Sequence, residues 1–173
     1  MNNYLDGKTA YLCGSIKGLK DSGTKWRETI TPLLQKMGIN VLDPCNKNTI
    51  ISEEVGKDKI KFQNMALKED WGNLKKEFWQ VVRYDLRCID RCDFVIVNYD
   101  PTVPTIGTVH ELVVATFEKK VILLKYDKDQ LESFNPWMAT FIKSHHFFPE
   151  WDSMLNYLGE VNKGILDTSY WVI

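Results

Sequence analysis

Two carboxylates, Asp85 and Glu111, stand out as residues that could act as an acid, a base or a nucleophile. Asp85 lies in a run over residues 73–92 whose apolar members recur at the spacing of one helix face, and it falls in the middle of that face. Burying an isolated carboxylate is costly, so such an acid is either paired with a cation or held for a reaction. Arg83 and Arg87 are candidate partners, and the helix alone leaves both interpretations open.

Glu111 follows a segment that predicts a strand, a loop and the start of a helix. Residues 93–99 are mostly apolar and β-branched, which is typical of a buried parallel strand, and residues 112–117 predict a helix. Thr108 and Glu111 have the spacing of a capping box, with Thr108 as the N-cap. The same place suits a ligand site, because open parallel sheets bind ligands outside the carboxyl ends of their strands.

The elements around these acids alternate between strand and helix patterns. Strands are predicted at 8–13, 39–43, 93–99, 120–126 and 146–148, and helices at 24–37, 73–92, 112–117 and 151–161. This alternation predicts an α/β fold with a doubly wound, mainly parallel five-stranded sheet, flavodoxin-like or Rossmann-like, in a single domain over residues 1–173. A charged insertion at about 45–72 predicts one or two short helices that cover the cleft or meet another subunit.

Composition narrows the classes of function. With 22 basic and 23 acidic residues, the net charge of −1 gives no reason to expect a nucleic acid polymer as a partner. The four cysteines have neither disulfide-framework density nor metal-site spacing, so we expect free thiols. The adjacent His145 and His146 lack a third ligand, and we expect no metal and no cofactor. No leader pattern or membrane-length apolar run occurs, so we expect a cytoplasmic protein that is not membrane-bound.

The sequence resembles the nucleoside 2-deoxyribosyltransferases and the related deoxynucleoside 5'-monophosphate N-glycosidases. The matching stretches are spread over most of the chain, at residues 11–15, 84–86, 93–97 and 107–112. The resemblance implies that Tyr11 hydrogen-bonds a nucleophilic carboxylate. It also implies that the apolar C-terminal tail at about 164–173 and Asn135 reach the site of a neighbouring subunit, and therefore a homo-oligomer with shared sites.

Two acids suit the cleavage of an N-glycosidic bond. One stabilises or attacks the anomeric carbon while the other supplies a proton to the leaving base, and a separation of about 5 Å accompanies a covalent, retaining route. We expect Glu111 to be the nucleophile, kept ionised near a helix N-terminus. We expect Asp85 to be the acid/base, with a raised pKa among apolar side chains.

Further residues could contact a deoxynucleoside or deoxynucleotide and a free nucleobase. Gly14 and Ser15 open a tight loop that could receive a hydroxyl or a phosphate, although an ordinary turn explains them equally well. Asp43 is predicted at the same sheet edge, where a turn-making role is also open. The remaining candidates belong to the Glu111 region and to the segment after the fourth strand: Asp100, Thr105, Gly107, Thr108 and Asn135.

Three functions follow from these residues. The first is transfer of 2-deoxyribose between nucleobases through a covalent intermediate on Glu111. The second is hydrolysis of deoxynucleoside 5'-monophosphates, because the loop at 14–18 is similar to that of the N-glycosidases and Lys17, Lys25 or Arg27 could bind a phosphate. The third is a nucleotide-binding domain without turnover. Thr102 and Thr105 stand where many deoxyribosyltransferases have a base-binding acid, so the base preference is open.

Overall fold

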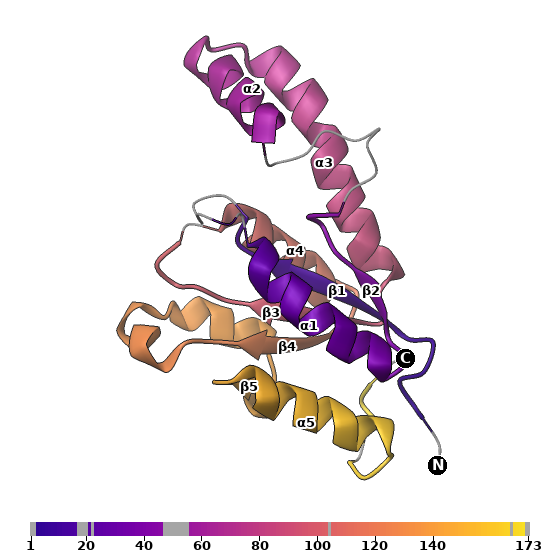
Figure 1. Ribbon diagram of the computed structural model, residues 1–173. Helices are drawn as coiled ribbons and strands as arrows, with labels where there is room; N and C mark the ends of the chain where they lie inside the picture. The colour runs from indigo at the N-terminus through magenta and orange to yellow at the C-terminus, as the bar shows by residue number, and fades with distance from the viewer. Residues whose placement is uncertain are drawn as a thin grey trace.

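The sheet of this protein is parallel throughout, as the sequence predicts (Figure 1). The computed structural model describes residues 3–16, 21, 23–46, 56–103, 105–166 and 168–171. Within them the strands are ordered β2-β1-β3-β4-β5, and the order reverses between β1 and β3. Their bounds are β1 Thr9–Gly14, β2 Asn40–Leu42, β3 Phe94–Asn98, β4 Val121–Lys125 and β5 Phe147–Phe148.

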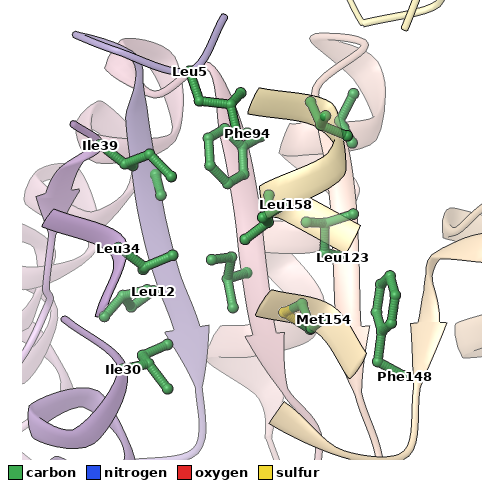
Figure 2. Close-up of a cluster of buried hydrophobic side chains, with 14 of the residues drawn as sticks. Leu5, Leu12, Ile30, Leu34, Ile39, Phe94, Leu123, Phe148, Met154 and Leu158 are labelled. Carbon is green, nitrogen blue, oxygen red and sulfur yellow. The ribbon is translucent and has the colours of Figure 1, made fainter. Parts of the chain in front are cut away.

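Helices cover both faces of the sheet. Alternate residues of β1 point to opposite faces, so Ala10 and Leu12 enter one core while Tyr11 and Cys13 enter the other. The first core packs against α1 (Thr24–Lys36) and α5 (Trp151–Asn162), as Figure 2 shows. The second core packs against α3 (Trp71–Arg91) and α4 (Ile106–Phe117). Short 3-10 helices follow β4: η1 Lys128–Ser133, η2 Pro136–Phe141 and η3 Ser144–His146.

A helical arm leaves the sheet layers, formed by α2 (Gly56–Leu67) and the first half of α3 (Figure 1). Phe62 and Phe78 pack edge to face, with ring centroids 5.0 Å apart, and Lys61 pairs with Glu77. On α3 the fully buried positions begin only at Val81. The helix predicted within 45–72 is therefore present as α2, although part of that insertion lies outside the described residues.

The C-terminal tail packs onto the chain's own body. Trp171 is 6% exposed and lies against Phe94, the first residue of β3, with ring centroids 5.4 Å apart. The Tyr170 hydroxyl lies 2.9 Å from the Tyr157 hydroxyl and 3.1 Å from His146 Nε2. The expectation that the tail reaches another subunit's site does not fit these two residues. Residues 172 and 173 lie outside the described part.

The buried His146 predicts a pH dependence of stability. Burial, then the nearby His145 and Lys143, lower its pKa to about 4. As the pH falls from about 6.5 to about 4, the unfolded chain gains a proton that the folded chain does not, so the free energy of unfolding should decrease by up to about 3 kcal/mol. Urea unfolding should show the full loss in the wild type, a somewhat smaller one in His145→Gln, where burial still lowers the pKa of His146, and a much smaller one in His146→Gln. Equal losses in all three would contradict it.

Candidate functional site

The Glu111 carboxylate lies against β1 at the point where the strand order reverses. The Tyr11 hydroxyl donates to Oε1 at 2.9 Å, and the Cys13 thiol donates to Oε2 at 2.8 Å. Tyr11 and Cys13 are two positions apart in one strand, so both side chains leave the same face of the sheet. In an open α/β sheet this reversal point, at the carboxyl ends of the strands, is where ligands bind. The contact that the resemblance implies for Tyr11 is thus present.

The predicted capping box is wrong. The helix α4 begins at Ile106 with Thr105 as its N-cap, and the Thr105 side chain makes no capping hydrogen bond. Thr108 is already inside the helix, and its buried side chain packs on the same face as Leu112 and Ala115. Glu111 consequently lies in the second turn, beyond the first turn within which the helix dipole acts strongly. The hydrogen bonds from Tyr11 and Cys13, instead of the helix dipole, favour the ionised form of the Glu111 carboxyl group.

The second acid, Asp85, is buried on the face of α3 that packs onto the sheet. It shares this face with Val81, Cys88 and Ile89 at helical spacing, and only 6% of Asp85 is exposed. Arg83 and Arg87, the cations considered as its partners, are both exposed. Asp85 lies near enough to Tyr11 for its charged form to raise the pKa of the phenol, whose hydroxyl donates to Glu111.

Both donors to Glu111 keep their protons. Burial, and then the charges of Glu111 and Asp85, raise the pKa of Tyr11 well above its usual value. Burial, and then the Glu111 charge, likewise raise the pKa of the Cys13 thiol, although Arg27 and a hydrogen bond with Thr108 oppose the shift. Sequence reasoning missed Cys13 as a site residue. The signal was available, because period two places it on the same strand face as Tyr11.

The buried Arg27 holds the loop that follows β1. Its guanidinium donates to the carbonyls of Gly23 at 2.7 Å, Gly14 at 3.0 Å and Leu12 at 3.3 Å. Its Nε lies 3.4 Å from Asp43 Oδ1, which also accepts a hydrogen bond from the backbone of Cys45. Arg27 was considered as a phosphate ligand. Its donors point to carbonyl and carboxylate oxygens of the protein instead. Asp43 directly follows β2, and its carboxylate contacts Arg27 and the backbone of the next turn.

Gly14 and Ser15 form the first part of this loop. A side chain at Gly14 would meet the Asn98 carbonyl oxygen at 2.9 Å, so only glycine fits so close to β3. Ser15 is buried, and its Oγ has no hydrogen-bond partner among the described residues. A buried hydroxyl without a partner could form a hydrogen bond with an oxygen atom of a ligand. Lys25 is exposed, and Lys17 lies outside the described residues.

The other predicted contacts lie at loop and helix ends. Asp100 Oδ1 accepts hydrogen bonds from the Thr102 amide and hydroxyl, at 2.9 and 2.6 Å, and so shapes the turn after β3. Asn135 is exposed and caps η2 by accepting from the Trp137 amide at 3.0 Å. Gly107 is exposed in the first turn of α4, with open space where a side chain would be. The predicted contribution of Asn135 to another subunit stays a prediction.

Two hollows in the described part of the chain lie away from the two acids. Two open hollows lie on the helical arm, one lined by residues such as Ile60 and Met65 and the other by residues such as Gly72 and Trp79. Neither includes Asp85 or Glu111. Within the described part of the chain, no three His, Cys, Asp or Glu side chains gather as a metal site would require. No helix in that part combines the length and apolarity needed to cross a membrane.

Comparison with known proteins gives a consistent result. The model of the family described as nucleoside 2-deoxyribosyltransferase matches residues 10–146. A 2-deoxyribosyltransferase from Bacillus psychrosaccharolyticus has a TM-score of 0.59 and 17% identity, over 86% of this chain and 91% of that one. A conserved protein from Enterococcus faecalis has a TM-score of 0.59 and 14% identity, over 89% and 98%. A CMP N-glycosidase from Clostridium botulinum has a TM-score of 0.49 and 16% identity, over 88% and 98%. No curated protein sequence matches the chain.

The contacts of Arg27 predict a large loss of stability on its removal. Arg27→Met would leave the Leu12 and Gly14 carbonyls without their donor and Asp43 without its ion pair, so the free energy of unfolding should decrease by about 3 kcal/mol. Arg83→Met, at an exposed position, should change it by less than about 0.5 kcal/mol. Urea unfolding at neutral pH measures both. Similar values for the two variants would exclude this role for Arg27.

Proposed function

This chain belongs to the nucleoside 2-deoxyribosyltransferase family, and from that membership we propose that it transfers 2-deoxyribose from one nucleobase to another by way of a glycosyl ester on Glu111. The observation that carries the proposal is that both oxygens of the Glu111 carboxylate accept a hydrogen bond from the protein. Tyr11 and Cys13 donate to its two oxygens from one strand, beside the reversal point of the sheet. A carboxylate that is oriented by donors favouring its charged form is prepared for nucleophilic attack.

In the first step a Glu111 oxygen attacks the anomeric carbon of a deoxynucleoside. A carbon–oxygen bond forms as the carbon–nitrogen bond breaks, and the electron pair of that bond goes to the nucleobase, which accepts a proton from Asp85. The sugar is left as an ester of Glu111. The low exposure of Asp85 suits this role, because burial disfavours the charged form of a carboxyl group.

In the second step another nucleobase replaces the first. Its nitrogen attacks the anomeric carbon, the ester bond breaks, and its electrons return to the Glu111 carboxylate. Asp85 takes the proton that the incoming base releases, so both acids regain their starting states. Two inversions at one carbon retain the configuration. The name of the similar Bacillus protein, a 2-deoxyribosyltransferase, agrees with transfer, while the fold is what the two structures share.

A second candidate function is hydrolysis of deoxynucleoside 5'-monophosphates by the same two acids, with water as the acceptor. The specific observation that favours it is Ser15, whose buried Oγ lacks a partner among the described residues. A phosphate oxygen of the substrate would satisfy this hydroxyl. The Arg27 contacts that hold the Gly14 carbonyl would keep the loop in place for it.

Removal of the proposed nucleophile tests the first function. Purified protein is incubated with a deoxynucleoside and a different free base, and the exchanged nucleoside is quantified by chromatography. Glu111→Ala should reduce exchange at least about a thousandfold, because the covalent route is lost. Glu118→Ala, at the exposed C-cap of the same helix, should retain it.

Trapping completes this test. Intact-mass analysis of wild-type protein mixed rapidly with substrate should show a deoxyribosyl adduct, which peptide mapping should locate on Glu111. Near-normal exchange by a folded Glu111→Ala protein would refute the assignment of the nucleophile.

Parallel assays of a deoxynucleoside and its 5'-monophosphate separate the two functions. Hydrolysis predicts free base and sugar phosphate from the monophosphate, with no exchange when a second base is added. If Ser15 binds the phosphate, Ser15→Ala should lower kcat/KM for the monophosphate by about tenfold, the value of one good hydrogen bond, and leave the unphosphorylated substrate unaffected. An equal effect on both substrates would count against a phosphate site at Ser15.

A further inference from the structure

We propose that Cys13 is a positioning residue for Glu111, a second donor that orients the carboxylate together with Tyr11. The proposal rests on the proposed function, in which Glu111 attacks the sugar. The two donors use different oxygens, Tyr11 at 2.9 Å from Oε1 and Cys13 at 2.8 Å from Oε2. One hydrogen bond would let the carboxylate rotate about its terminal torsion, whereas two from fixed points define its plane.

The strand supplies these fixed points. Tyr11 and Cys13 are both fully buried in β1, and their neighbours Val95 and Val97 on β3 are equally buried. The strand backbone cannot shift without breaking its pairing with β3, so the spacing of the two donors is constant. Water has no access to the two donor side chains themselves, so the place of a lost thiol could be taken by a water molecule only if the packing changed.

The thiol remains a donor at neutral pH. Burial and the Glu111 charge raise its pKa, in contrast to reactive cysteines, whose pKa is lowered by nearby cations. Among the described residues, two further charged groups act on the two donors. Asp85 on α3 acts on Tyr11, and Arg27 on α1 acts on Cys13. Arg27 and the hydrogen bond with Thr108 favour the thiolate, and burial outweighs both. Cys13 thus acts on the reaction through Glu111 and not as a nucleophile.

This role predicts a particular kinetic pattern. A donor to the carboxylate favours its charged form, so removing the donor should raise the pKa of Glu111 and move the acid limb of the rate profile to higher pH. Orientation affects the chemical step more than substrate binding, so kcat should change more than KM. A purely structural role for Cys13 would lower stability without moving the acid limb.

Three variants test the proposal in the base-exchange assay. Cys13→Ala removes the donor, Cys13→Ser keeps one, and Cys92→Ala removes another buried thiol, which donates to the Ile89 carbonyl at 3.1 Å. For Cys13→Ala we expect kcat to decrease about tenfold, KM to stay within about twofold and the acid limb to rise by about one pH unit, as the loss of one hydrogen bond implies. Cys13→Ser should recover most of kcat, and Cys92→Ala should match the wild type.

Either of two kinetic results would overturn the proposal. One is a Cys13→Ala protein with kcat within about twofold of the wild type and an unmoved acid limb, since one hydrogen bond is worth about tenfold. The other is an equal loss of kcat in Cys13→Ala and Cys92→Ala, which would reduce the effect to general destabilisation. If Cys13→Ala does not fold, the comparison of Cys13→Ser with the wild type and the spectroscopic measurement below decide the outcome.

The infrared S–H stretching band gives a readout that does not depend on activity. The Cys13 band, identified by its absence from Cys13→Ser, should lie at lower frequency in the wild type than in Glu111→Ala, because a hydrogen bond weakens the S–H bond. An identical frequency in both would refute the contact. A wild type that shows this shift but exchanges no base and cleaves no monophosphate would refute the proposed function alone.

Discussion

Much of this structure serves one contact, the Glu111 carboxylate held against β1 by Tyr11 and Cys13. The sheet must be parallel and must reverse its strand order beside β1, so that a helix following β3 can return over that strand. The end of β1 must also lie close to β3, which Gly14 permits, and Arg27 holds the Gly14 carbonyl there. The Glu111 carboxylate is tolerated between α4 and the sheet because both of its oxygens accept hydrogen bonds.

The fold follows from the sequence because its strands are short apolar runs separated by clear helical patterns. Residues 93–99 and 120–126 differ from the observed β3 and β4 by one residue at each end. The sequence also singles out the two acids, Asp85 because it interrupts an apolar helix face and Glu111 because it follows a strand at the end of the sheet where ligands bind. The expectation for Asp85 agrees with its position on the buried face of α3.

Other parts of the site depend on tertiary contacts that local patterns do not report. The sequence suits an N-cap at Thr108, but α4 starts earlier, at Ile106, because its apolar face must align Thr108, Leu112 and Ala115 with the sheet. That shift moves Glu111 from a cap position to a contact across the layers. Arg27 was considered as a phosphate ligand, although its position on the buried face of α1, three residues before Ile30, places it inside. Most of its partners are backbone carbonyls, which a sequence pattern does not report.

The continuity of α3 links the arm to the site. This helix has 21 residues, about 31 Å in length, and it carries the arm on its first half and Asp85 on its second. The arm and the acid therefore share one unbroken run of helical backbone. Asp85 is carried over the sheet by a helix whose other half lies beyond the sheet layers.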